Sequence, residues 1–264
     1  MSDTGAGRVV VEQHGAVLRI GLNRPEKRNA ADRALLHELA AAYTRLERDD
    51  TVGVGVVHAE GDHFTAGLDL ADVGPSLATG TIDYRSEDEI DPWGLSGPER
   101  TKPVVVAVHG TCLTLGIELI LAADVAVAAD SSSFGQIEVS RGILPFGGAT
   151  ARLPAAVGWG NAMRWMLTGD RFDAAEALRI GLVQEVVPDG TELSAATAIA
   201  ERIAAQAPLA VQAVLRSARA GRRAAEAPVL AGLQPALAAL AASADAAEGA
   251  RAFQDRRDPV WTGR

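Results

Sequence analysis

Apolar and polar residues follow strand and helix spacing in turn along the first part of the chain. Two apolar runs in "RVVVEQHGAVLRIGL" (8–22) flank a His-Gly pair, which predicts a β-hairpin. A loop, "NRPEKRNA" (23–30), comes next. In "DRALLHELAAAYTRLERDD" (32–50) leucines and a tyrosine recur at helical spacing behind Asp32, so a helix with Asp32 as its N-cap is expected.

Further apolar runs predict more strands with helices between them. "PVVVAVHG" (103–110) is continuously apolar, which is typical of a strand buried on both faces. After Pro188 the pattern indicates helices only, to about residue 256. Strands are also predicted at 52–59, 125–129 and 182–187, and helices at 161–169 and 173–181.

A strand-strand-helix unit recurs through the first two-thirds of the chain, so the fold class is α/β with a helical C-terminal part. We divide it into a core over 1–190 and a helical region over 191–264. Residues 71–102 are polar, with Pro, Gly and a cluster of acids, and are expected to form a mobile surface segment.

Composition narrows the function. The 264 residues are 48% hydrophobic with a formal net charge of −9, which supports a packed core and argues against nucleic acid as a partner. The single cysteine, Cys112, excludes a disulfide framework. The first residues lack the apolar core of a signal peptide, and no stretch reaches membrane-span length without polar interruption. A soluble cytoplasmic protein is therefore expected, with no membrane partner.

Glu118 stands inside the apolar stretch "HGTCLTLGIELILAAD" (109–124), where a carboxylate loses hydration and needs a reason to be present. A strand ends near Gly110 and a helix begins near 114–116, so free N–H groups of a first helical turn lie close by. The turn in "GDHFTAGLDL" (61–70) has the same form. Together the two turns could make a two-donor oxyanion hole, although the spacing alone leaves a structural role open.

Glu138 is a second acid in an apolar setting, between Ile137 and Val139 and ahead of "PFGG" (145–148). Alone it would be taken for a solvated residue on an edge strand. Paired with Glu118 it could form one site in which burial raises both pKa values and separates them, as general acid–base catalysis requires.

The chain resembles the enoyl-CoA hydratase/isomerase (crotonase) family over nearly its whole length. The resemblance rests on "NRPEKRNA", "HFTAGLDL", "KPVVVAVHGTCLTLGIELILAADVAVAA", the stretch from "FGQIEVSRG" to "GLVQEVV", and the tail "GARAFQDRR". It implies a crotonase-like spiral of stacked ββα units with a CoA-thioester site, and a C-terminal helical region used for trimer contacts. Trimers of the family commonly pair into hexamers, so a homotrimer or hexamer is expected.

The resemblance also assigns roles. It implies that Glu118 and Glu138 are the two catalytic glutamates, and that the backbone N–H groups of Leu68 and Leu115 form the oxyanion hole. The basic tail residues Arg256 and Arg257 resemble those that reach CoA on a neighbouring subunit. The residues expected to contact substrate or CoA are Arg24, Lys27, Arg28, Ala66, Gly67, Asp69, Leu70, Gly116 and Phe146.

Two positions depart from the family pattern. Thr114 and Leu115 stand where the family often has glycines, and Phe146 stands where hydratases usually carry a glycine whose N–H helps to hold the attacking water. A ring at 146 could narrow the acyl pocket, displace the water or fold away. The divergent segment 71–102, with Tyr84 and Trp93, is where acyl specificity is expected.

The resemblance favours hydration of an enoyl-CoA thioester, with no metal and no redox cofactor, because CoA is part of the substrate. Four alternatives stay open. They are an isomerase using Glu138 alone, a hydrolase with Cys112 as nucleophile, a metal site at His58 and His63, and a non-catalytic acyl-CoA-binding homologue.

Overall fold

A mostly parallel sheet forms the centre of the molecule. The computed structural model describes residues 7–77 and 82–264. The six strands have the order β1-β2-β3-β4-β6-β9, and only the β1–β2 hairpin is antiparallel. They are β1 (Val9–His14), β2 (Val17–Leu22), β3 (Val54–Ala59), β4 (Val104–Val108), β6 (Val125–Ala129) and β9 (Glu185–Val187).

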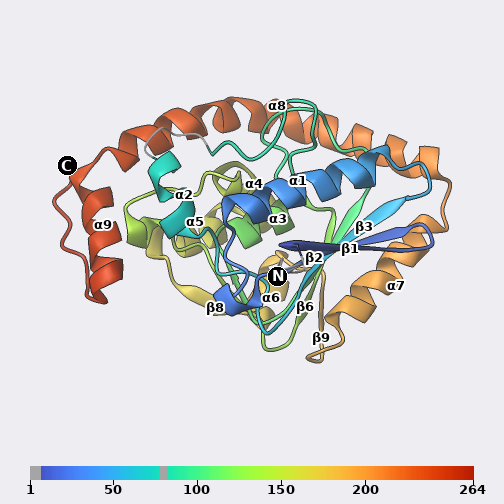
Figure 1. The fold of residues 1–264 in the computed structure, drawn as a ribbon, viewed down its shortest axis with the longest axis horizontal. Helices are drawn as coiled ribbons and strands as arrows, with labels where there is room; N and C mark the ends of the chain where they lie inside the picture. The colour runs from blue at the N-terminus through green and yellow to red at the C-terminus, as the bar shows by residue number, and fades with distance from the viewer. Residues whose placement is uncertain (1–6, 78–81) are drawn as a thin grey trace, which may run out of the picture.

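A smaller three-stranded sheet and the helices surround this centre (Figure 1). The smaller sheet consists of β5 (Thr111–Leu113), β7 (Ser133–Gly135) and β8 (Arg171–Asp173). The short 3₁₀ turns are η1 (Pro25–Lys27) and η2 (Glu138–Arg141). The helices are α1 (Arg33–Arg48), α2 (Leu70–Leu77), α3 (Leu115–Ala122), α4 (Ala149–Val157), α5 (Trp159–Thr168), α6 (Ala174–Ile180), α7 (Glu192–Ala204), α8 (Pro208–Ala241) and α9 (Ala244–Asp255).

The hydrophobic pattern is confirmed where it was strongest. The Asp32 carboxylate accepts a 2.8 Å hydrogen bond from the Leu35 N–H and caps α1, as expected. Every residue of β4 is buried, because this strand lies inside the sheet and is covered on both faces. The hairpin, the strands at 54–59 and 125–129, and the helices α5 and α6 also lie where the sequence predicts them.

The segment after the turn at 61–70 differs from the expectation. Residues 71–102 were expected to form a mobile surface segment, but the chain continues as α2 to Leu77 and later buries Ile90, Asp91 and Trp93. Of this segment, residues 78–81 lie outside the described residues. The acids that made the sequence look solvated include Asp91, whose carboxylate instead organises the buried loop.

Of the C-terminal helices, α7 packs against the central sheet, whereas α8 and α9 lie on the outside. α7 lies just beyond residue 190, yet Ala196 and Ala200 pack against β3, β4 and β6, so its packing places it with the core. α8 arches over the whole length of the molecule and α9 turns back at its end (Figure 1). The predicted helical region after 190 is therefore present, with α8 and α9 as its outer part.

By length and composition alone, α8 could cross a membrane. An 18-residue window of this helix has a hydropathy of 1.3, and 17% of the window is buried. The sequence expectation that no stretch was apolar enough therefore needs this qualification. However, Glu226 of α8 is buried and ion-paired, and Leu233 and Leu237 pack into the protein, which indicates a helix that lies on its own chain.

Candidate active site

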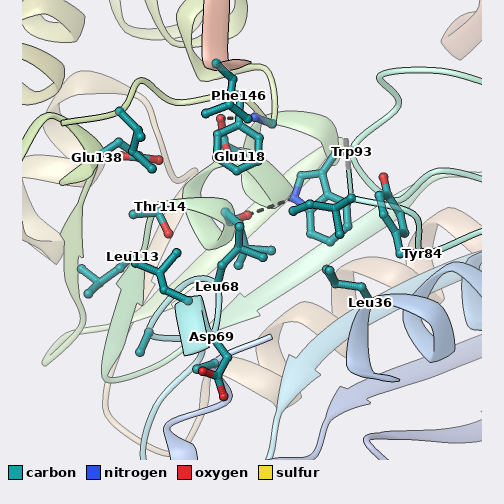
Figure 2. Close-up of a pocket in the computed structure, with 18 of the residues that line it drawn as sticks. Leu36, Leu68, Asp69, Tyr84, Trp93, Leu113, Thr114, Glu118, Glu138 and Phe146 are labelled. Carbon is teal, nitrogen blue, oxygen red and sulfur yellow. Dashed lines mark hydrogen bonds between the residues drawn. The ribbon is translucent and has the colours of Figure 1, made fainter. Parts of the chain in front are cut away.

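A cavity of about 810 Å³ lies where the two strand-to-helix turns meet. Figure 2 shows Glu138 at one end of the cavity and the Tyr84–Trp93 pair at the other, with Leu68 between them and Glu118 close by. All five residues line it. The predicted catalytic pair, far apart in sequence, is thus brought to one cavity.

Glu118 sits in α3, buried at 3% exposure, and its carboxylate faces the start of α4. Oε1 accepts hydrogen bonds from the N–H groups of Gly147 at 2.7 Å and Ala149 at 3.1 Å. A Cβ at Gly147 would collide with this carboxyl group, so glycine is required for the approach. Burial raises the pKa of Glu118 to about 7, and the two N–H groups and the positive charge of Arg152 limit the rise.

Glu138 begins the η2 turn rather than lying on the edge strand that its neighbours suggested. It is 5% exposed, and Oε1 accepts a 2.9 Å hydrogen bond from the Gln136 side chain. Oε2 is buried and has no partner among the described residues. Burial, and next the negative charge of Glu118, hold the pKa of Glu138 well above its ordinary value. Because the Glu118 charge is one cause of the raised Glu138 pKa, Glu118 is the member of the pair that ionises first as the pH rises.

Leu68 presents its N–H to the cavity. The flanking groups pair with Ala31, because the Ala31 N–H donates to Gly67 C=O and the Asp69 N–H donates to Ala31 C=O. Successive N–H groups of an extended chain point in opposite directions, so the Leu68 N–H faces away from Ala31. Within residues 7–77 and 82–264 it has no hydrogen-bond acceptor.

Leu115 is the first residue of α3, and its N–H is likewise free of protein acceptors in the described part of the chain. The preceding residue, Thr114, has φ 48° and ψ −111°, a conformation that favours glycine. It is held there from both sides, because its N–H donates to Gly135 C=O at 2.9 Å and its C=O accepts from the Glu118 N–H at 3.1 Å. Threonine at position 114 thus adopts the backbone conformation of this turn, although the family often has glycine here.

The two glycines of these turns are packing positions. A Cβ at Gly67, which has φ 97°, would collide with the Thr114 hydroxyl, and a Cβ at Gly116 would collide with Thr65. Neither glycine lines the cavity. They bring the two turns together, so that the N–H groups of Leu68 and Leu115 face one space.

The basic loop is only partly directed at the cavity. Lys27 and Arg28 line it, and their contact with CoA stays a prediction. Arg24 does not, because its guanidinium is 2.7 Å from Asp69 and 3.2 Å from Asp32 in a buried network. We therefore correct the expectation that Arg24 contacts CoA: it fixes the loop. The other predicted contacts Ala66, Asp69 and Leu70 do line the cavity.

Asn29 organises the same loop and was missed from the sequence. Its side chain accepts a hydrogen bond from the Arg24 N–H and donates to the carbonyls of Glu60 and His63. Its φ of 52° is left-handed, a conformation that asparagine tolerates better than most residues. The only sequence feature that could have indicated this role is the presence of an asparagine in the loop.

Phe146 neither folds away nor lies outside the site. Its half-buried ring lines the cavity, and Figure 2 shows it against Glu118. The neighbouring Gly147 N–H is occupied by Glu118 at 2.7 Å. The ring thus narrows the space around the carboxylate without removing the carboxylate from the cavity.

Two aromatic rings pack together in the opposite wall. Trp93 and Tyr84 meet edge to face, with ring centroids 5.9 Å apart. The Asp91 carboxylate accepts from the Tyr84 hydroxyl and from the N–H groups of Trp93, Leu95 and Ser96. A single buried carboxylate therefore shapes the loop that the sequence indicated as the acyl wall.

Two alternative sites lose support. Cys112 is fully buried, does not line the cavity, and burial raises the pKa of its thiol, so no reactive thiolate is available. His63 accepts from the Thr111 N–H, whereas His58 lies beside Glu60. Among the described residues, no group of three or more His, Cys, Asp or Glu side chains is placed to hold a metal ion.

The C-terminal helices close the cavity from outside. Gln234 and Leu237 of α8 and Phe253 of α9 line it. The two tail arginines do not, and Arg257 is paired with Glu248 at 2.5 Å. A contact of Arg256 or Arg257 with CoA on a neighbouring subunit stays a prediction.

An α/β core with a C-terminal helical region, and a cavity that joins two buried carboxyl groups to two free backbone N–H groups, define a crotonase-type enzyme. Comparison with known proteins agrees. The enoyl-CoA hydratase/isomerase family model matches residues 12–264, and the chain belongs to this family.

Individual relatives cover nearly all of the chain. Enoyl-CoA hydratase EchA19 of Mycobacterium tuberculosis is 34% identical over 97% of this chain and 96% of its own. A probable enoyl-CoA hydratase/isomerase from Mycobacterium abscessus is 50% identical, with a TM-score of 0.80 over 97% of this chain and 99% of that one. A carnitinyl-CoA hydratase from Mycobacterium avium is 38% identical, with a TM-score of 0.89 over 98% and 100%. These similarities support a hydro-lyase.

Proposed function

We propose that the protein is an enoyl-CoA hydratase that adds water across the 2,3 double bond of an enoyl-CoA thioester. The observation that carries the proposal is the placement of Glu118 and Glu138 in one cavity with the two free N–H groups. The reaction needs neither a metal nor a redox cofactor, because an oxyanion hole and two carboxyl groups supply its chemistry.

The thioester carbonyl binds between the N–H groups of Leu68 and Leu115. When water attacks C3, negative charge develops on the thioester oxygen, and both donors stabilise the enolate that forms. Loss of one such donor typically costs about 3 kcal/mol of transition-state stabilisation. Because both donors belong to the backbone, Gly67 and Gly116 matter through the positions they give to these turns.

The carboxyl groups divide the proton transfers. Ionised Glu118 takes a proton from the attacking water, and protonated Glu138 gives its proton to C2 of the enolate. The pKa directions support this division, since Glu138 is held protonated by burial and by the Glu118 charge. The backbone N–H groups of Gly147 and Ala149 favour ionised Glu118.

An isomerase using Glu138 alone is the runner-up. It would leave no chemical task for Glu118, whose burial in a catalytic cavity is costly for a carboxylate. The fixed approach of its Oε1 to two backbone donors is what a positioned base requires. This favours the hydratase.

The cavity supports an uncharged, apolar acyl group. Leu36, Ile82, Tyr84 and Leu95 surround Trp93 in this wall, and the Asp91 carboxylate beside them is already bound by four donors. A series of enoyl-CoA thioesters of increasing length tests this, and highest kcat/KM with a charged acyl group would contradict it.

The direct test compares turnover with binding. We expect the protein to hydrate crotonyl-CoA or a longer enoyl-CoA, followed by loss of the enoyl absorbance. The binding of saturated butyryl-CoA is measured in parallel. Binding of thioesters without turnover of any enoyl-CoA in the series would favour the non-catalytic homologue instead.

A further inference from the structure

Arg152 is a buried cation at the centre of a hydrogen-bond network beside the site. It lies in the first turn of α4 and is 5% exposed. Nε donates to the Glu226 carboxylate at 3.1 Å, and the two terminal nitrogens donate to Trp93 C=O at 2.5 Å and Gly94 C=O at 3.1 Å. One guanidinium thus joins three separate segments.

The first connection leads to the oxyanion hole. Trp93, whose carbonyl is bound by Arg152, donates its indole N–H to Leu115 C=O at 3.1 Å (Figure 2). Leu115 is the residue whose own N–H faces the cavity. The position of this donor is therefore fixed from the side of the acyl-wall loop as well as by Thr114.

The second connection leads to Glu118. The N–H groups of Gly147 and Ala149 that bind this carboxylate flank Gly148, the N-cap of α4, and Arg152 follows in the first turn of this helix. The charged groups that act on Glu118 are Arg152 and Glu138. The Arg152 charge opposes the rise of the Glu118 pKa that burial causes, and Glu138 is the like-charged neighbour when ionised.

The third connection leads to the C-terminal region. Glu226 is 5% exposed and comes from α8, where Arg222 also pairs with it at 2.7 Å. A buried ion pair is a weak source of stability, because desolvation offsets its attraction. Its value here lies in fixing the position and charge of Arg152 between α8 and the site.

We propose that Arg152, held by Glu226, is a positioning residue for catalysis that fixes Leu115 through Trp93 and supplies a permanent positive charge beside Glu118. The proposal rests on the hydratase function proposed above. It makes α8 part of the catalytic apparatus, although α8 contributes no reacting group.

Two substitutions distinguish the effect of the Arg152 charge from the effect of its hydrogen-bond geometry. Arg152→Lys keeps the charge and loses the fork, so kcat should fall about 10-fold with KM nearly unchanged, and the acid limb of the kcat–pH profile should stay in place. Arg152→Gln also loses the charge. Its acid limb should move to higher pH, because the pKa of Glu118 rises when the neighbouring positive charge is removed.

A second ion pair that ends on α8 provides a matched control. Glu99→Gln breaks the Glu99–Arg223 ion pair, which at 2.6 Å also ties a loop to α8 but does not reach the site. It should leave kcat and the pH profile unchanged. Glu226→Gln, which frees the Arg152 charge from its partner, should move the acid limb to lower pH.

A readout without turnover keeps the proposal separate from the hydratase assignment. Trp93→Phe keeps an aromatic ring in the wall but is smaller and has no indole N–H, and the thioester carbonyl stretch of bound butyryl-CoA should move toward that of the free thioester. This is measured even if the wild-type protein hydrates nothing. An unchanged stretch in Trp93→Phe, or Arg152 variants with lower melting temperatures but wild-type kcat and pH limbs per folded site, would overturn the proposal.

Discussion

At the scale of single residues, the site consists of two carboxyl groups, Glu118 and Glu138, that are buried in an apolar interior. Glu118 and Glu138 are both nearly inaccessible, and neither has an ion-pair partner among the described residues. Glu118 receives two backbone N–H groups, whereas one oxygen of Glu138 has no partner. This asymmetry supports the proposed division of the two identical side chains into a base and an acid.

The pH profile should be bell-shaped. Below about pH 7 the Glu118 carboxylate becomes protonated, because burial raises its pKa to about 7, and activity falls. At higher pH, ionisation of Glu138 removes the proton that C2 requires. The two limbs belong to the coupled pair. Measurement of kcat/KM from pH 5 to about 10 tests this, and a flat profile through neutrality would contradict it.

Phe146 should set the size of the acyl group. Phe146→Ala removes the ring from the wall beside Glu118, so longer or branched enoyl-CoA substrates should gain in kcat/KM relative to crotonyl-CoA. Trp159→Ala, which removes an aromatic ring that is 72% exposed, serves as the control. The same substrate profile in a folded Phe146→Ala variant would show that the ring does not limit the site.

Some site residues could be identified from the sequence and others could not. Glu118 was predictable because a carboxylate in an apolar run is unusual by itself. Arg152 was not, because its three partners come from segments that only the fold brings together. Arg24 was assigned to CoA for the converse reason: the sequence shows its charge but not Asp69 and Asp32 beside it.

At the scale of elements, two strand-to-helix turns create the proposed oxyanion hole. The turns touch through Gly67 and Thr114, and the strained backbone of Thr114 starts α3. An active site can store such strain when hydrogen bonds fix the residue on both sides. The N–H groups of Leu68 and Leu115 are thus positioned before substrate binds.

Gly67→Ala should therefore damage catalysis without contact with the substrate. The added Cβ would collide with the Thr114 hydroxyl, and φ 97° is strained for alanine, so kcat/KM should fall by at least about 10-fold. Gly74→Ala in α2, where a Cβ meets no atom within 4 Å, is the matched control. Adding Thr114→Gly should restore part of the loss, and wild-type kcat/KM in Gly67→Ala would contradict the packing argument.

The elements were predictable where burial and periodicity agree. β4 and α1 lie where their apolar spacing placed them. The loop through Asp91 and Trp93 was not recognised, because its order comes from one carboxylate that binds four donors, and no periodic pattern reports that. Glu138 likewise lies in a 3₁₀ turn that its apolar neighbours do not reveal.

At the scale of the whole molecule, the outer helices leave apolar surface uncovered. α8 and α9 expose Leu209, Val214 and Phe253 by 79%, 68% and 55%. Large apolar side chains that are left exposed on outer helices can be covered at a subunit interface. Together with the family resemblance, this supports the prediction of a trimer or hexamer.

The oligomeric state should follow from that surface. Light scattering at micromolar concentration should give three or six times the chain mass, and Leu209→Glu should weaken the assembly, because it places a charge on the exposed face of α8. The matched substitution Leu178→Glu, on α6, should not. A wild-type monomer would contradict the prediction.

The most direct test of the central claim is the hydration rate of crotonyl-CoA, or the best enoyl-CoA in the series, by Glu118→Gln and Glu138→Gln. Each variant should lose at least about 100-fold in kcat, whereas butyryl-CoA binding survives because the oxyanion donors are backbone groups. The double variant should lose less than the product of the two single effects, since the carboxyl groups act as a unit. Full hydratase activity in Glu118→Gln, with only its melting temperature changed, would contradict the two-glutamate mechanism and leave the isomerase using Glu138 alone.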